Sequence, residues 1–254
     1  MRVVLTRPEQ EAVRWLQPLQ ARGHEVMPLP LIAIRPLADL GLLHQAWKRL
    51  PSCAAAMFVS ANAVHHFRAA APDAPWPAGP RAWATGPGTL QALLQAGVPP
   101  DRIDAPAPDA PQFDSEALWR GVQGQVPPGG TVLVVRGADA QGRLAGRDWL
   151  AREMEARGLV VEQVAAYRRE LPAWGRAQFA QAAAAARDGS VWLFSSSEAV
   201  ANLRQLLPGQ DWSAARALAT HERIAQAARE AGFGVVWPSR PSVEGVTGIL
   251  ESIR

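Results

Sequence analysis

The chain has 254 residues, of which 48% are hydrophobic and 19% charged, a composition typical of a folded globular protein and not of a disordered one. The net charge is only +3, and the basic residues are scattered among acids, which argues against a nucleic-acid-binding protein but suits a ligand that carries carboxylates. The sequence lacks a membrane-spanning apolar stretch and an N-terminal signal segment, and its single cysteine excludes an internal disulfide, so we expect a cytoplasmic protein with Cys53 as a buried thiol.

The first predicted elements are a strand over residues 3–5 and a helix that begins shortly after it. Thr6 is the expected N-cap, because Glu9 stands three residues later as in a capping box and Pro8 suits a first helical turn. The expected buried stripe of this helix consists of Ala12, Leu16 and Leu19. Gly23 is expected to end the helix, and residues 24–34 continue as extended chain.

The same plan recurs near the middle of the chain. A strand over 131–135 is followed by a helix with Leu150 and Met154 on its buried side, by a stop at Gly158, and by extended chain over 159–167. Alternating strands and helices continue to the C-terminus, which predicts an α/β fold with parallel sheets. The proline-rich stretch 99–112 is predicted to be an extended surface loop.

Similar segments recur in the same order along the chain, which indicates an internal duplication. MFVSANAV (57–64) matches LFSSSEAV (193–200) at an offset of 136, and ATGPGTLQALLQAGV (84–98) matches ATHERIAQAAREAGF (219–233) at an offset of 135. A third pair is VVLTRP…ARGHEV with VLVVRG…ARGLVV, and a fourth, weaker pair is DSEAL with PSVEGV. Four ordered pairs at nearly one spacing predict two copies of one α/β unit.

Polar residues follow most of the predicted strands, where the carboxyl ends of parallel strands bind ligands in α/β folds. Each of these residues could act as a helix cap alone, although the free N–H groups beside a cap also form an anion site. We therefore predict sites for a polyanion in which hydroxyls, arginines and backbone N–H groups act together. The candidate substrate-binding residues are Thr6, Arg7, Ser60, Ala61, Asn62, Thr85, Gly86, Arg136, Gly137, Ser195, Ser196, Ser197, Thr220 and His221.

Other kinds of site have little support in the sequence. The segment TGPGT (85–89) lacks the third glycine of a dinucleotide fingerprint, and its repeat partner THERI has no glycine. His65 and His66 are adjacent instead of spaced as metal ligands on a helix, and a Gly-x-Ser-x-Gly elbow is absent. We expect neither a metal site nor a nucleophilic triad.

The motifs together resemble the uroporphyrinogen-III synthase family. They are LTRP (5–8), FVSANAV (58–64), ATGPGT (84–89), DSEAL (114–118), Arg-Gly at 136–137 with GRDWL (146–150), AYRRE (166–170), FSSSEAV (194–200) and ATHERIAQAA (219–228). They cover nearly the whole chain in the order of the family, which is itself built from a duplicated α/β unit.

The resemblance implies two similar doubly wound, flavodoxin- or Rossmann-like parallel-sheet domains joined by a two-stranded linker. Residues 1–34 and 172–254 would form the first domain, and residues 37–165 would form the second, inserted domain. The linkers would be 31–36 and 165–172, each closed by a proline, Pro36 or Pro172. The substrate would lie in a cleft between the domains, and the protein would be a monomer.

The resemblance also implies the reaction, which is closure of hydroxymethylbilane with inversion of its ring D and loss of water. The family uses no cofactor and no metal, so the protein would act by positioning the substrate and by supplying a proton to the departing hydroxide. Tyr167, the only tyrosine of the chain, is implied as the catalytic proton donor. The competing hypothesis for Tyr167 is a packing role at the hinge, with its hydroxyl in water. A transient contact with the preceding enzyme of the pathway is the expected protein partner.

The sequence departs from the family between Gly137 and Gly146, where residues 138–145 form a longer loop that contains Arg143. This loop either contacts the substrate or projects into solvent. Two other functions remain as alternatives. One is a two-lobed cytoplasmic binding protein for a polycarboxylate without catalysis, and the other is a nucleotide-dependent enzyme, which the incomplete glycine motif disfavours.

Overall fold

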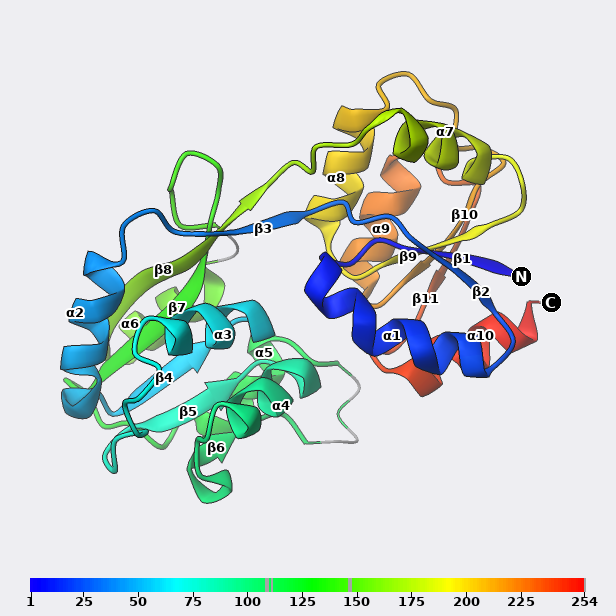
Figure 1. Cartoon of the computed structure of the whole chain (residues 1–254). Coiled ribbons are helices and arrows are strands. Elements are labelled where there is room, and N and C mark those ends of the chain that lie inside the picture. The colour runs from blue at the N-terminus through cyan, green and yellow to red at the C-terminus, as the bar shows by residue number, and fades with distance from the viewer. Residues whose placement is uncertain (108–109, 111, 146–147, 254) are drawn as a thin grey trace. The chain divides into compact units, whose positions relative to one another are not determined.

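The structure is a computed structural model that describes residues 1–107, 110, 112–145 and 148–253. It has an α/β architecture with parallel sheets, which confirms the predicted fold class. The chain divides into two compact units, the first formed by Met1–Ala33 with Glu170–Arg254 and the second by Ile34–Arg169 (Figure 1). Within the described parts of the chain, none of the helices has the length and hydropathy needed to cross a membrane.

The first unit is built on five parallel strands. These are β1 (Arg2–Leu5), β2 (Glu25–Pro28), β9 (Val191–Phe194), β10 (Arg216–Ala219) and β11 (Val235–Pro238). Their order in the sheet is β11-β10-β9-β1-β2. The helices of this unit are α1 (Glu9–Ala21), α7 (Arg176–Ala185), α8 (Ser197–Leu206), α9 (Glu222–Glu230) and α10 (Val243–Ser252).

Strand β9 shows why this sheet carries helices on both faces, since all four of its residues are completely buried. Val191 and Leu193 pack in one cluster with residues of α1 and α10. Trp192 and Phe194 alternate with them and contact the ring of Phe233, which belongs to the opposite face. A continuous apolar strand is the expected sequence of a parallel sheet covered on both sides.

The second unit is built on six strands, β3 (Ala33–Pro36), β4 (Ala55–Phe58), β5 (Arg81–Ala84), β6 (Ile103–Asp104), β7 (Thr131–Ala138) and β8 (Val160–Glu170). Their order is β3-β8-β7-β4-β5-β6. The helices are α2 (Gly41–Arg49), α3 (Ala61–Ala69), α4 (Pro87–Gln95), α5 (Ser115–Val122) and α6 (Trp149–Ala156), with short 3₁₀ turns at η1 (Leu50–Ser52) and η2 (Pro100–Arg102).

The sheet of the second unit also has two apolar faces. Phe58 and Val135 pack with residues of α2, α3 and α4, whereas Met57 and Val134 pack with residues of α5 and α6. Cys53 lies in the first of these clusters and is 5% exposed. Burial is the main cause that raises the pKa of its thiol, which confirms the prediction of a buried thiol.

The two sheets have the same strand order once the repeated segments are matched. The second sheet, read from its β6 edge, has the order β6-β5-β4-β7-β8, which corresponds strand by strand to β11-β10-β9-β1-β2 in the first sheet. Strand β3 is an additional edge strand of the second sheet. This agreement is what a duplication of one α/β unit produces.

Two local predictions were wrong. Helix α1 begins at Glu9 with Pro8 as its N-cap, and it has no side-chain cap; the Thr6 hydroxyl instead donates a 2.6 Å hydrogen bond to the Leu193 carbonyl on β9. The Thr6 hydroxyl therefore links the end of β1 to β9 instead of capping α1. Its buried acceptor lies on a strand far along the chain, so a local sequence pattern could not predict this contact. In the predicted stripe of α1, Trp15 is buried in place of Leu16, whereas Ala12 and Leu19 are buried as predicted.

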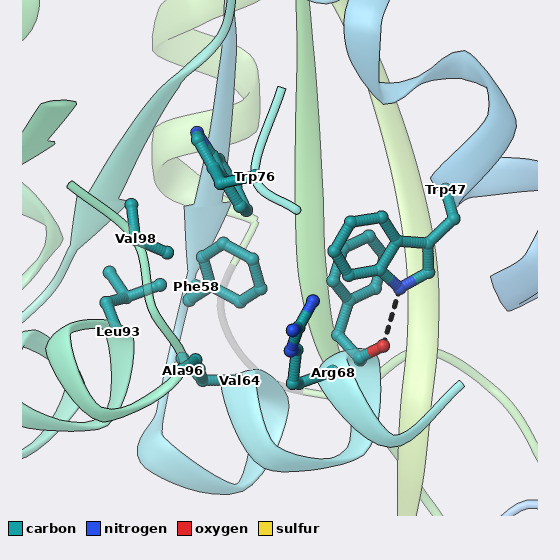
Figure 2. A pocket seen from close by; sticks show the side chains of 9 residues that line it. Trp47, Phe58, Val64, Arg68, Trp76, Leu93, Ala96 and Val98 are labelled. Carbon is teal, nitrogen blue, oxygen red and sulfur yellow. Dashed lines mark hydrogen bonds between the residues drawn. The ribbon is translucent and has the colours of Figure 1, made fainter. Parts of the chain in front are cut away.

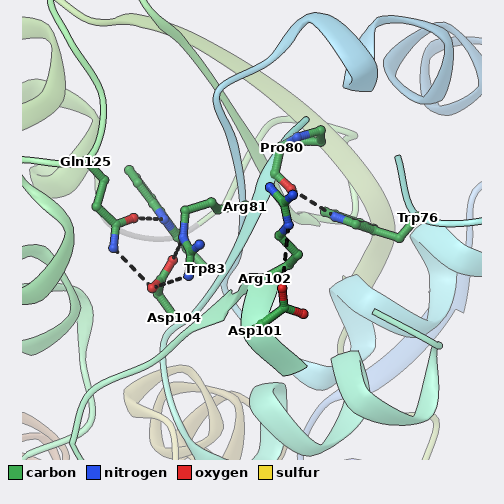
Figure 3. Close-up of polar contacts among 8 residues, drawn as sticks. All are labelled: Trp76, Pro80, Arg81, Trp83, Asp101, Arg102, Asp104 and Gln125. Atoms are coloured by element: carbon green, nitrogen blue, oxygen red, sulfur yellow. Dashed lines mark hydrogen bonds and ion pairs between the residues drawn. The ribbon is translucent and has the colours of Figure 1, made fainter. Parts of the chain in front are cut away.

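The stretch 99–112 is also more structured than predicted, because it contains η2 and the edge strand β6; residues 108, 109 and 111 lie outside the described residues. The Arg81 guanidinium donates two hydrogen bonds, of 2.6 and 2.8 Å, to the Asp104 carboxylate of β6 (Figure 3). Gln125 donates to the same carboxylate and accepts from the indole of Trp83. Two residues are too few to show the alternating pattern of a strand, so β6 is recognised only from its parallel pairing with β5 in the folded chain.

Candidate functional site

The second unit brings its predicted site residues to one edge of its sheet. Phe58 at the end of β4 pairs with Ala84 of β5 and with Val135 of β7, so the residues that follow these three positions lie side by side. That edge carries the predicted residues Ser60, Ala61, Asn62, Thr85, Gly86, Arg136 and Gly137, and β8 adds Tyr167.

A β-bulge determines which way Tyr167 points. Arg136 pairs with Ala165, but the next residue, Gly137, pairs with Tyr167, so Ala166 is an extra residue on β8. Val164, Ala166 and Tyr167 all belong to the apolar cluster that includes α3. Strict alternation would have sent residue 167 to the opposite face; the bulge turns the tyrosine towards α3 instead.

Gly137 lies directly under the Tyr167 ring. A Cβ atom at position 137 would be 2.8 Å from two ring carbons and 3.1 Å from the phenol oxygen. Carbon atoms in ordinary contact are about 3.5–4.0 Å apart, so any side chain at position 137 would overlap the ring. The absence of a side chain at residue 137 is therefore what allows the tyrosine to lie against β7.

The phenol of Tyr167 is hydrogen-bonded to Ser60. Its hydroxyl oxygen is 3.0 Å from Ser60 Oγ, and either atom can donate. Ser60 is the N-cap of α3, and its Oγ also accepts the backbone N–H of Ala63 at 3.1 Å. Tyr167 is 3% exposed, so the competing hypothesis of a hydroxyl left to water does not describe this structure.

His66 is a functional candidate at this edge that the sequence did not indicate. Its imidazole stacks on the Tyr167 ring, with centroids 5.6 Å apart and planes inclined by 26°. Burial is the main cause that lowers the pKa of His66, and the charge of neighbouring His65 adds to the shift. A lowered pKa keeps the imidazole neutral at pH 7. His66 was noted only as an unsuitable metal ligand, since its contact with Tyr167 depends on the bulge.

Thr85 and Gly86 lie at the turn between β5 and α4. The Thr85 hydroxyl donates to the Val59 carbonyl at 3.2 Å, and Gly86 is the N-cap of α4 without a side-chain cap. Ala61 and Asn62 are buried in the first turn of α3. These residues surround the N-termini of α3 and α4, where backbone N–H groups face the sheet edge.

Arg136 is buried, and its guanidinium donates hydrogen bonds to neighbouring groups of the protein. Nη1 donates to Asp148 Oδ1 at 2.7 Å and to Gln163 Oε1 at 2.8 Å, and Nε donates to the Ala145 carbonyl at 3.0 Å. The Arg136 side chain is only 4% exposed. This arrangement ties β7 to β8 and to the segment before α6, so its main observed role is structural.

The first unit presents Thr6 and Arg7 at the end of β1. The Arg7 guanidinium lies 4.4 Å from the centroid of the Trp15 ring, and its Nη1 is 3.3 Å from Glu11 Oε2. Burial lowers the pKa of Arg7, and Glu11 opposes that shift. Arg7 is thus folded back onto α1, where an acidic and an aromatic side chain hold it.

The other predicted residues of the first unit lie around two helix N-termini. Ser196 caps α8 by accepting the Glu198 N–H, and His221 caps α9 by accepting the Arg223 N–H on Nδ1. Ser195 and Thr220 follow the ends of β9 and β10, and Thr220 is buried. The Ser197 hydroxyl is 3.5 Å from the Arg223 carbonyl and links the two helices.

The loop over 138–145 is organised by its own residues. Asp139 accepts the backbone N–H groups of Gln141 and Arg143, and its carboxylate pairs with the Arg143 guanidinium at 2.8 Å. The Arg143 side chain is 76% exposed. Residues 146 and 147 of the GRDWL motif lie outside the described residues.

The cavity among Trp47, Phe58, Phe67 and Arg68 is too small to hold a substrate (Figure 2). Its volume of about 10 Å³ is roughly that of a single water site. The aromatic rings around it pack against one another, with Trp47 and Phe67 stacked at 4.6 Å. Among the described residues, groups of three or more His, Cys, Asp or Glu side chains that could hold a metal ion are not found.

Comparison with known proteins identifies a family for this chain. Residues 13–248 match the family model described as uroporphyrinogen-III synthase HemD. The fold is similar to that of a mutant uroporphyrinogen III synthase from Thermus thermophilus, with a TM-score of 0.59 at 17% identity, covering 100% of this chain and 98% of the other. It is also similar to uroporphyrinogen-III synthetase from Helicobacter pylori, with a TM-score of 0.59 at 14% identity and 100% coverage of both chains. None of the curated proteins matches the sequence.

Proposed function

Because the chain belongs to the uroporphyrinogen-III synthase family, we propose that it closes hydroxymethylbilane to uroporphyrinogen III, with inversion of ring D and loss of water. Membership in this family implies a lyase-type enzyme of heme biosynthesis. The proposal goes further and assigns a cyclising hydro-lyase reaction to this chain, with Tyr167 as its proton donor. The observation that carries the assignment is the family match over residues 13–248.

The first chemical step requires a proton. The bond between the terminal carbon and its hydroxyl breaks as the pyrrole nitrogen supplies electrons, and the departing hydroxide takes the Tyr167 proton to give water and tyrosinate. The substituted carbon of the far ring attacks the azafulvene, and the spiro intermediate fragments and recloses with that ring inverted. Ring closure releases a proton, and its return to the tyrosinate restores the phenol. The net change is the loss of water, and all electrons stay within the substrate.

Several features of Tyr167 support this role. It is the only tyrosine of the chain, it lies at the ligand-binding edge of a parallel sheet, and its hydroxyl is bonded to the cap of α3. A phenol has an ordinary pKa of about 10, which makes it a competent acid towards hydroxide. Because the side chain is 3% exposed, donation requires that substrate binding uncovers the hydroxyl.

Binding of the substrate carboxylates is assigned to helix N-termini and to arginines. Helices α3 and α4 in the second unit, and α8 and α9 in the first, begin directly after strand ends, and the partial positive charge at a helix N-terminus favours the binding of an anion there. Arg7 supports the same assignment in the first unit, where a substrate carboxylate would compete with Glu11 for its guanidinium.

Product analysis tests the function. Purified protein is incubated with freshly prepared hydroxymethylbilane, the products are oxidised, and the type I and type III porphyrins are separated. Type III in excess over a blank without protein is the expected result. Only type I porphyrin, at the rate of the blank, would refute the synthase. Calorimetric binding of the substrate together with that failure would favour the alternative, a polycarboxylate-binding protein without catalysis.

A further inference from the structure

Ser60 occupies an unusual position among the helix caps of this chain, because its oxygen serves a helix and a phenol at once. Its Oγ is 3.1 Å from the Ala63 N–H, which is the ordinary capping contact of α3. The same atom is 3.0 Å from the Tyr167 hydroxyl on β8. The side chain therefore connects the N-terminus of α3 to the proposed proton donor.

The hydrogen bond between Ser60 and Tyr167 changes its character when the phenol loses its proton. A serine hydroxyl has one proton and two acceptor lone pairs, and the Ala63 N–H uses one lone pair. The bond to Tyr167 can then run in either direction. While the phenol is intact, either hydroxyl can donate. Once the phenol has lost its proton, only Ser60 can donate, and the bond becomes a stronger, charge-assisted one.

The helix strengthens this effect. The N-terminus of a helix carries a partial positive charge, and an N–H group that donates to Ser60 Oγ polarises the serine hydroxyl towards its other partner. Negative charge on the phenol oxygen would form next to that polarised hydroxyl and inside a nearly water-free environment, since Tyr167 is 3% exposed. An environment of this kind stabilises charge at the moment it develops.

We infer that Ser60 is a positioning residue that couples the N-terminus of α3 to Tyr167 and stabilises the tyrosinate formed when the proton leaves. This role differs from direct contact between Ser60 and the substrate, and it rests on the proposed function. Two contacts hold the tyrosine ring, Gly137 beneath it and the His66 imidazole stacked on it, and the β-bulge at Ala166 directs the side chain towards α3.

A single tyrosine makes the inference testable without any substrate. The near-ultraviolet absorbance of tyrosinate reports on Tyr167 alone, because the ten tryptophans do not ionise in the same way. Ser60→Ala removes the hydroxyl, and Ser60→Thr keeps it. Ser242→Ala is the matched control, because Ser242 caps α10 with the same 3.1 Å contact, to the Gly245 N–H. Circular dichroism at each pH confirms that the protein stays folded during the titration.

In Ser60→Ala, tyrosinate is expected to appear about one pH unit higher than in the unmodified protein, which corresponds to a tenfold loss of its stabilisation. The kcat for type III formation is expected to fall about tenfold with little change in KM, because the contact acts after binding. Ser60→Thr should restore both values, and Ser242→Ala should leave both unchanged.

Two results would overturn the inference. An unchanged tyrosinate titration in folded Ser60→Ala would show that the serine does not stabilise the phenolate. A raised KM with unchanged kcat would show that Ser60 contacts the substrate directly. If the unmodified protein forms no type III product, the proposed function fails, whereas the titration still decides whether Ser60 and Tyr167 are coupled.

Discussion

Gly137→Ala tests the packing that holds the proposed proton donor. The added Cβ would be 2.8 Å from two carbons of the Tyr167 ring, against an ordinary carbon separation of about 3.5 Å. The ring would have to move by about 0.7 Å. It cannot do so freely, because it is 3% exposed, stacks on His66 and is hydrogen-bonded to Ser60. We expect a loss of about 1–3 kcal/mol of unfolding free energy, as for other overpacked sites, together with reduced turnover.

The assay is urea unfolding followed by circular dichroism, carried out on a double-mutant cycle with Tyr167→Leu. Leucine lacks the outer ring atoms of Tyr167 that the added Cβ would meet. In the Tyr167→Leu background, Gly137→Ala should therefore lower the unfolding free energy by less than about 0.5 kcal/mol. Gly121→Ala is the control, because residue 121 lies in α5 with no atom within 4 Å of an added Cβ, and it should be neutral or stabilising by up to about 1 kcal/mol. An equal cost of Gly137→Ala with tyrosine and with leucine at 167 would refute the proposed clash.

Three other predictions concern the same unit. Tyr167→Phe keeps the ring but loses the hydroxyl, so type III formation should fall at least about tenfold while the unfolding free energy changes by about 1 kcal/mol or less; normal turnover would return Tyr167 to a packing role. Since burial lowers the pKa of His66 in the folded state, the unfolded state binds more protons just below pH 6.5, and stability should fall as the pH drops through that region. The loss of stability at low pH should be smaller in His66→Gln than in the unmodified protein. Equal losses in these two proteins would show that the lowered pKa of His66 does not cause the pH dependence. Arg136→Ala should cost about 2–3 kcal/mol in urea unfolding, because it leaves Gln163 and the Ala145 carbonyl without their donor, whereas the exposed Arg143→Ala should change stability by less than about 0.5 kcal/mol. Equal effects of the two arginine substitutions would show that the buried network contributes no stability.

The sequence predicted the larger elements well because their signals are local. The helix stops at Gly23 and Gly158 are confirmed, since both glycines adopt a positive φ that other residues avoid. The buried positions of Leu150 and Met154 are confirmed for the same reason, as helical periodicity is written in consecutive residues. The predicted cap at Thr6 failed because the hydroxyl had a better acceptor on β9, 187 positions away in the chain.

The sequence could select site residues from local patterns, but it could not predict which of their side chains meet. The strand-end rule selected Ser60 and the family resemblance implied Tyr167, but neither predicted the 3.0 Å contact between their hydroxyls. Arg136 was selected because arginines suit carboxylate ligands, and nothing in the sequence indicated that its guanidinium also donates to Asp148, Gln163 and a backbone carbonyl. His66 was not selected, because a histidine on a helix has no distinguishing sign until the side chain that it stacks on is known.

The sequence by itself determined the α/β class and the family, because periodicity and ordered motifs are patterns along a single chain, and the duplication that it predicts is consistent with the matching strand orders. Only the tertiary structure decided which side chains meet. An extra residue on β8 against β7 turns Tyr167 to the face of α3, and a glycine at 137 leaves room for its ring. Side-chain direction in a strand depends on register with its neighbour, and register is a property of two segments brought together by folding.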